Sequence, residues 1–554
     1  MLRKSKLLFV VALTLVVVFA LAGCGAPKNE GKGSDNAGKE EVKQKITYNL
    51  GSEPETLDPG KVTGNPDMTA INAMMEGLTR YNMDGELEPA MAKDWDISPD
   101  GTVYTFKIRE DAKWSNGDPV TAEDFEFAWR QILDPEFAAD YAYELYYLKN
   151  AAAYNDFEDT SVTSPDQIGV EAVDAKTLEV TLAAPAPQFL GLTAFPAYFP
   201  VHKATATANP DWHAEPETYV NNGPFKMTVW EHDQKIVFEK NETYWDKDSV
   251  RLDELVMTLV SSESTELAMF ETGDIDVGDN PPNEEMDRLK ADANYGLTIG
   301  GDLSTYYYVF NTTAKPFDDV RVRKALTMAI DREAIVENIA KAGQIPAFAY
   351  VPFGLDDADK SKDFREEGGN DYFAENLEKA QELLAEAGYP NGEGFPEFEI
   401  LNTDRELYLN IAQAIQEMWK QNLGIEGVKV ISQEWGSYLK ARAELDYLVA
   451  AAGWGADYAD PMTFLDMYIK DGGNNDTGWS DERYDQSIAK ANSTNDQAVR
   501  MQAMHEAEDI LMEAMPLMPI YFYTNPYIMK DYVKDVVVPD FGPNMDFKWA
   551  YVEK

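Results

Sequence analysis

The sequence predicts an α/β protein, and three observations lead to that class. Apolar residues alternate with polar ones in short runs such as 46–50 and 177–182, which is the pattern of half-buried strands. Residues 377–387 and 406–422 instead repeat apolar side chains at helical spacing, and a glycine closes each segment. The length of 554 residues leaves room for three or four domains. Strands that alternate with helices in a chain of this length indicate mixed α/β domains.

Residues 1–23 have the form of an export signal. Three positive residues among the first six precede an apolar run at 7–22, which is somewhat short for a bilayer-spanning helix of ~20 residues. The run ends in Leu-Ala-Gly-Cys, which resembles the lipobox of bacterial lipoproteins, and that resemblance implies that Cys24 is acylated and becomes the new N-terminus. An uncleaved anchor helix with a chance cysteine is the alternative. Cys24 is the only cysteine, so the chain has no internal disulfide framework.

Residues 24–45 consist mainly of Gly, Lys, Glu, Asn and Ser, with almost no apolar content. Such a segment cannot bury enough surface to become ordered, so we predict a flexible tether. The folded body is expected to start near Ile46. No second run in the sequence is apolar and long enough to span a membrane.

The predicted elements of the body follow in chain order. An alternating run at 104–108 predicts a strand, Asn-Gly at 116–117 a tight turn, and Thr121 the start of a helix with acidic residues in its first turn. Val428 and Val430 begin another strand, and residues 447–452 are apolar on both faces, as in a buried strand.

Composition excludes several functional classes. Asp and Glu number 98 against 48 Lys and Arg, and a formal charge of −50 makes nucleic acid an improbable partner. Four scattered histidines show no metal-ligand spacing, and no phosphate-binding loop, nucleophile elbow or zinc-protease motif is present, so we expect neither enzyme activity nor a cofactor. The acidic segment 471–482 has the length of a calcium loop, but Asp476 replaces the required glycine, which favours a surface or cleft-rim loop.

Residues 89–129 carry a specific resemblance. The run from Trp95 through the Ala-Lys-Trp-Ser segment to Pro-Val-Thr-Ala-Glu-Asp-Phe closely resembles the signature of extracellular solute-binding proteins of the peptide and nickel class. The resemblance implies a type II periplasmic-binding-protein-like fold, with two lobes joined by a hinge and an extra domain. It further implies three domains with discontinuous boundaries: domain I at 46–75, 206–303 and 524–554, domain II at 76–205, and domain III at 304–523.

Residues 453–461, Gly-Trp-Gly-Ala-Asp-Tyr-Ala-Asp-Pro, resemble the oligopeptide-binding branch of that class. In that branch the Asp of the Ala-Asp-Tyr triplet receives the α-ammonium of the peptide, which assigns this role to Asp457. Chemistry agrees, because peptides of varied sequence share only their backbone and termini, which a carboxylate and a strand edge can hold. A helix N-cap before Pro461 or a structural ion pair is the alternative reading of Asp457.

The resemblance implies further ligand contacts. Two segments match backbone-contacting positions: Gly453 to Gly455, and Thr63, Gly64 and Asn65. Five aromatic residues match pocket positions or are core residues: Trp435, Trp454, Tyr141, Tyr307 and Tyr523.

Two further positions leave alternatives open. Arg442 meets a peptide carboxylate or is a solvated helix arginine, and Asn280 lies at the cleft or in a turn. Val309 and Ala451 replace charged residues that receive the peptide C-terminus in some relatives, so the resemblance does not say how that end is held.

The sequence therefore predicts a monomeric binding lipoprotein on the extracytoplasmic face of the membrane. It would capture oligopeptides and deliver them to a membrane ABC permease with its ATPase subunits. The same scaffold with a dipeptide, a peptide pheromone, a nickel chelate or an oligosaccharide is one alternative, and a surface hydrolase or adhesin is another.

Overall fold

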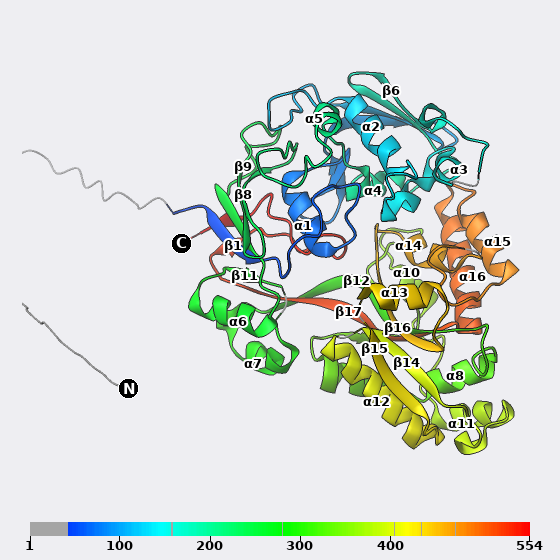
Figure 1. The fold of residues 1–554 in the computed structure, drawn as a ribbon. Coiled ribbons are helices and arrows are strands. Elements are labelled where there is room, and N and C mark those ends of the chain that lie inside the picture. The colour runs from blue at the N-terminus through cyan, green and yellow to red at the C-terminus, as the bar shows by residue number, and fades with distance from the viewer. Residues whose placement is uncertain are drawn as a thin grey trace, which may run out of the picture. The chain divides into compact units, whose positions relative to one another are not determined.

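Two long antiparallel strands, β12 (Thr298–Phe310) and β17 (Leu517–Met529), lie side by side in the largest sheet (Figure 1). This computed structural model describes residues 42–156, 159–279, 281–403, 405–433, 435–470 and 472–553. The predicted signal, Cys24, most of the tether and Asn280 lie outside the described residues. Strand β1 (Lys45–Asn49) begins one residue before the predicted start of the folded body.

The described residues form an eleven-stranded mixed sheet in the order β15-β14-β16-β12-β17-β11-β1-β10-β9-β8, with β13 also paired to β17. Parallel pairs join β14 to β15 and β1 to β10, and antiparallel pairs join β12 to both of its neighbours. The remaining strands of this sheet are β8 (Phe225–Glu231), β9 (Lys235–Lys240), β10 (Glu254–Thr258), β11 (Val277–Gly278), β13 (Ile345–Pro346), β14 (Phe398–Thr403), β15 (Val428–Gln433) and β16 (Val449–Gly455).

Both faces of β12 are covered in its C-terminal half, from Thr305 to Phe310. Tyr306, Tyr308 and Phe310 belong to one hydrophobic cluster, whereas Tyr307 and Val309 belong to another. Successive side chains of a strand point to opposite faces, so a strand buried on both sides has an almost continuous apolar sequence.

The helices of the described residues cover these sheets or pack on one another (Figure 1). Their bounds are α1 (Asn65–Met74), α2 (Ala122–Ile132), α3 (Ala151–Asn155), α4 (Phe189–Leu192), α5 (Lys203–Ala208), α6 (Glu263–Thr272), α7 (Met286–Ala291), α8 (Val320–Met328), α9 (Arg332–Ile335), α10 (Phe364–Gly368), α11 (Leu377–Glu386), α12 (Glu406–Leu423), α13 (Trp435–Ala443), α14 (Met462–Leu465), α15 (Glu482–Ala491) and α16 (Gln497–Ala514). None of them is long and apolar enough to cross a bilayer.

A second, antiparallel sheet carries the sequence signature. Its order is β4-β5-β7-β6, with bounds β4 (Ala92–Ile97), β5 (Val103–Ile108), β6 (Val170–Asp174) and β7 (Thr177–Thr181). Thr121 caps α2 and forms a capping box with Asp124, which also accepts a hydrogen bond from the Trp114 indole at 3.2 Å. The signature residues therefore stabilise a helix start. Two short pairs complete the strands, β2 (Thr79–Tyr81) with β3 (Leu87–Pro89) and β18 (Val533–Lys534) with β19 (Tyr551–Val552).

The buried strand predicted at 447–452 is present but displaced towards the C-terminus, because β16 spans Val449–Gly455. It pairs with β12 along its whole length, from Val449 to Gly455. On its other edge β14 pairs only with Val449 and Ala450. Among the described residues, the edge of β16 beyond Ala450 therefore has no neighbouring strand.

The α/β class is confirmed. The strands predicted at 46–50, 104–108 and 177–182 and the helices at 377–387 and 406–422 are present to within two residues. Residues Val42–Lys554 form one compact unit, and the three-domain division stays a prediction.

Candidate functional site

The end of β16 opens onto a cavity of about 760 Å³. Gly453 to Asp457 line one part of it. Other parts come from Asn65 at the start of α1, from Tyr141 in the short helical turn η1 (Asp140–Tyr147), and from Tyr523 in β17. Segments far apart in the sequence thus meet at the unpaired edge of β16.

One end of this cavity is acidic. Asp457 is buried, and its carboxylate accepts hydrogen bonds from the side chains of Tyr141 and Glu144. Burial raises the pKa of Asp457 to about 7. Burial and then the charge of Asp457 raise the pKa of Glu144 well above its usual value, so Glu144 is the protonated partner that donates. The same two causes raise the pKa of Asp466 to about 7.

These three carboxyl groups have no cationic partner in the described part of the chain. Asp460, only three residues after Asp457, differs sharply, because Arg500 binds it through two contacts of 2.6 and 2.8 Å. A buried carboxylate without a cation is costly, and this cost raises the pKa values of all three groups. A ligand that brings a positive charge would relieve this cost.

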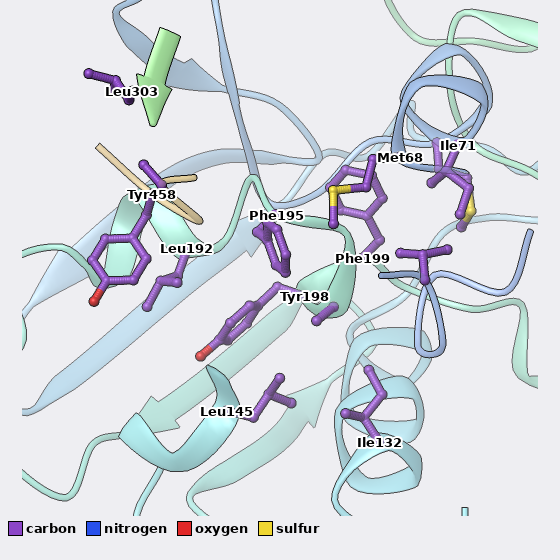
Figure 2. Packing of buried hydrophobic residues seen from close by; sticks show 14 of the residues in the cluster. Met68, Ile71, Ile132, Leu145, Leu192, Phe195, Tyr198, Phe199, Leu303 and Tyr458 are labelled. Atoms are coloured by element: carbon purple, nitrogen blue, oxygen red, sulfur yellow. The ribbon is translucent and has the colours of Figure 1, made fainter. Parts of the chain in front are cut away.

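The surroundings explain the raised pKa values. Figure 2 shows Leu145, the neighbour of Glu144, in one cluster of buried side chains with Leu192, Tyr198 and Tyr458. The Tyr198 hydroxyl donates to the backbone carbonyl of Glu144 at 2.7 Å. Water is therefore excluded from one side of the carboxyl groups, and the charged form loses its solvation.

The wall next to this acidic end is exposed backbone. Gly453 and Gly455 lie two residues apart, so their Cα hydrogens face the same side of β16. A Cβ on Gly453 would lie 3.3 Å from the Tyr523 hydroxyl, and a Cβ on Gly455 would lie 2.9 Å from Ser304 Oγ. An extended chain can approach such an edge and pair with it through main-chain hydrogen bonds.

A second cavity of about 430 Å³ adjoins the first, because Arg405, Gly453 and Tyr523 line both. Its wall is aromatic. Tyr408 and Tyr523 share a hydroxyl contact of 3.0 Å, and Trp435 stacks on Tyr438 with ring centroids 5.5 Å apart.

Most of the predicted site residues line these cavities. The first cavity contains Asn65, Tyr141, Gly453, Trp454, Gly455, Asp457 and Tyr523, and the second contains Trp435, Arg442, Gly453 and Tyr523. Thr63 and Gly64 directly precede α1 and line neither cavity. Asn280 lies outside the described residues.

Tyr307 is placed differently from the expectation of a pocket residue. Its side chain is completely buried in the core and lines neither cavity, because both faces of β12 are covered. We therefore do not retain Tyr307 in the site.

Arg442 is not a solvated helix arginine. It is buried, its guanidinium lies 2.8 Å from Asp476, and it donates to the Tyr438 hydroxyl at 3.1 Å. This pairing occupies Asp476 of the acidic loop. No cluster of His, Cys, Asp or Glu suited to a metal ion occurs in the described part of the chain.

Sequence reasoning missed Glu144, Asp466 and Arg405. Glu144 is the one acid in the aromatic segment 141–148, and that isolation is the one signal that marks it. Asp466 and Arg405 carry no comparable signal, since an acid after a short helix and an arginine before a long one are common surface features.

A family model described as "Bacterial extracellular solute-binding proteins, family 5 Middle" matches residues 86–476. Two proteins of Bacillus subtilis (strain 168) are each 40% identical to this chain: "Oligopeptide-binding protein OppA", with 98% of both chains covered, and "Dipeptide-binding protein DppE", with 99% of both covered.

Solved structures agree with this match and confirm the predicted type II solute-binding fold. An oligopeptide ABC transporter substrate-binding domain from Bacillus anthracis superposes with a TM-score of 0.81 at 34% identity, covering 93% of this chain and 99% of the other. Haemophilus influenzae OppA in complex with the peptide RPPGFSPFR gives 0.80 at 32% identity, covering 93% and 100%. Members of this family are binding proteins rather than enzymes, as the sequence led us to expect. The chain belongs to the bacterial extracellular solute-binding proteins of family 5.

Proposed function

We propose that this chain captures oligopeptides and holds their N-terminal ammonium at Asp457. The observation that supports this proposal is the buried group of Asp457, Glu144 and Asp466, which has no cationic partner among the described residues. An ammonium supplies the missing charge, and Glu144 remains as a donor to Asp457. The names of the relatives OppA and DppE support a peptide as the ligand.

The free edge of β16 supports the same ligand. Residues 451–455 pair with β12 on one side only, and Gly453 and Gly455 are exposed on the other edge. A peptide added at this edge would be held through groups that every peptide shares. The cavities beside the edge would accept side chains without demanding one sequence.

The predicted anchor and delivery belong to this proposal. Acylated Cys24 would keep the protein at the extracytoplasmic face of the membrane, and residues 24–45 would let the folded body extend away from the lipid anchor. The protein would act as a monomer and pass its peptide to an ABC permease. Closure of the proposed domains, 46–75 with 206–303 and 524–554, 76–205, and 304–523, would enclose the peptide.

Calorimetry on the purified full chain tests the central step. Tetraalanine should bind, and Asp457→Asn should weaken its binding several hundred-fold to a few thousand-fold, because a buried ammonium without its partner costs roughly 3–5 kcal/mol. The N-acetylated peptide should also bind the wild type much more weakly than tetraalanine, because it brings no positive charge to Asp457. Equal affinity for the free and acetylated peptides would remove Asp457 from the proposed role.

A further inference from the structure

Two segments of the chain contact each other beside the first cavity. Segment 76–205 contributes Tyr141 to the cavity wall, and segment 304–523 contributes Gly453 to Asp457. Among the described residues, no strand of segment 76–205 pairs with a strand of segment 304–523. Parts of a chain that share no sheet can move relative to each other unless a large apolar interface joins them. The side-chain contacts between these two segments therefore influence whether the cavity is open or closed.

Three side-chain contacts join the segments next to the acidic end of the cavity, and together we call them the latch. The latch consists of Glu144 with Asp457, Tyr147 with Tyr458, and Gln188 with Arg500. The Glu144 carboxyl donates to Asp457, the two tyrosine hydroxyls lie 3.0 Å apart, and Arg500 donates to Gln188 Oε1 at 3.2 Å. All of these side chains except that of Tyr147 are buried. The latch therefore lies inside the molecule.

The latch contacts reach the loop that carries Asp457. Asp460 in this loop pairs with Arg500 through contacts of 2.6 and 2.8 Å. The Asp457 N–H donates to Thr463 Oγ1 at 3.1 Å. Because Arg500 holds this loop and also donates to Gln188, the position of segment 76–205 is linked to the position of Asp457.

The contact between Glu144 and Asp457 requires a proton. An ionised carboxyl group only accepts hydrogen bonds, so two carboxylates cannot bond to each other. Once both groups are ionised, two buried negative charges face each other, and the charge of Asp466 adds to their repulsion. Loss of the proton on Glu144 therefore turns an attraction between the two segments into a repulsion.

The groups around this pair do not replace the proton. Those that face it are Tyr141, Tyr143, Tyr147, Tyr198, Tyr458 and Asp466, and Asp140 lies next to the first of them. Burial raises the pKa of each of these tyrosines, so their hydroxyls stay neutral when Glu144 ionises. Arg500, the cation of the latch, is already paired with Asp460. Glu144 is therefore the group whose ionisation changes the latch.

We propose that the latch keeps the peptide-free cavity closed while Glu144 carries a proton and releases it when Glu144 ionises. This inference rests on the proposed function. A peptide ammonium at Asp457 adds a positive charge beside the same carboxyl groups, so the complex should stay closed at a pH at which the empty protein opens. Glu144 is a positioning residue, because it acts on the peptide through Asp457 and through the closure of the two segments.

Small-angle X-ray scattering of the purified, peptide-free full chain at pH 6, 7, 8 and 9 tests the latch. The closed form holds one proton more than the open form, so the ratio of closed to open molecules should fall about tenfold for each pH unit while both forms are populated. Glu144→Gln keeps a donor to Asp457 but has no proton to lose, and this variant should stay closed up to pH 9.

A pair of neighbouring tyrosines provides a matched control. Tyr147→Phe removes one latch contact and should move the opening about half to one pH unit lower, as expected for the loss of one hydrogen bond. Tyr146→Phe should open at the same pH as the wild type, because the Tyr146 hydroxyl donates to Asn155 of its own segment at 2.6 Å. Circular dichroism at each pH verifies that every variant is folded.

Two outcomes would overturn the latch: a wild-type scattering curve that stays the same from pH 6 to 9, or a Glu144→Gln variant that opens in parallel with the wild type. At pH 8, saturating tetraalanine should return the wild type to the closed form, whereas N-acetylated tetraalanine at the same concentration should not. Failure of the latch leaves the penalty for N-acetylation in place. Failure of the proposed function removes that penalty but leaves the opening of the peptide-free protein with rising pH.

Discussion

The affinity for peptides should fall as the pH falls from 7 to 5. Burial raises the pKa of Asp457 to about 7 in the ligand-free protein, so the carboxyl is mainly protonated below that pH. The ammonium of a peptide requires the ionised form, because only the carboxylate attracts its charge. Binding below pH 7 must therefore release a proton from the site.

The magnitude follows from the titration of one group. With a pKa of about 7, roughly 1% of Asp457 is ionised at pH 5 and about half at pH 7. The dissociation constant should therefore be about 50-fold higher at pH 5, a difference of ~2.3 kcal/mol. The peptide amine stays mostly charged over this range, since its pKa is about 8.

Calorimetry of tetraalanine at pH 5, 6 and 7 measures this dependence directly. At pH 6 the same experiment in two buffers of different ionisation enthalpy should show release of about 0.9 proton for each peptide bound. Asp457→Asn is the control, because its residual weak binding should show no such pH dependence.

A dissociation constant that is constant between pH 5 and 7, with no proton released, would refute this reasoning. It would mean that the carboxylate stays ionised in the empty cleft and that some cation compensates it.

Three further predictions separate the roles of the buried acids. Asp460→Asn should lower the thermal unfolding midpoint, since an unpaired buried Arg500 costs roughly 3–5 kcal/mol, whereas Asp457→Asn should leave the midpoint unchanged. Similar losses for the two variants in calorimetric scans would contradict a structural role for Asp460 and a binding role for Asp457. Glu144→Gln keeps a donor to Asp457 and should retain the affinity for tetraalanine at pH 7 within about threefold, while Glu144→Leu should lower that affinity about tenfold or more. Equal losses of affinity in the two variants would show that the charge of Glu144 is needed. Asp457 and Asp466 titrate at higher pH in the folded than in the unfolded chain, so the ligand-free protein should lose stability as the pH rises from about 4 to 7. Thermal scans of Asp457→Asn should show a smaller decline of the unfolding midpoint over this range. An equal decline in the wild type and the variant would contradict this linkage.

Local patterns predicted much of the fold. Alternation identified β1, β5 and β7, and glycine punctuation identified the ends of α11 and α12. The predicted bounds of β16 were less accurate, because Gly453 and Gly455 lack the apolar side chains that mark a strand. Pairing with β12, which no local pattern reveals, extends the strand to these glycines.

Sequence reasoning identified residues of the proposed site only where they belong to a motif. Asp457 stands in a recognisable run, but Glu144 comes from a segment more than 300 residues earlier, and tertiary folding alone brings the two together. For Tyr307 the sequence left pocket and core open, since an aromatic residue in a strand gives no sign of which faces are covered, and the structure places it in the core.

The two tryptophans on the cavity walls have a practical consequence. Trp435 is 59% exposed and Trp454 is half-buried, while Trp114, Trp129 and Trp419 are shielded in the interior. Indole emission depends on the polarity around the ring, so the intrinsic fluorescence of the protein responds chiefly where ligand replaces water. Occupancy of the cleft can thus be followed optically without any added dye.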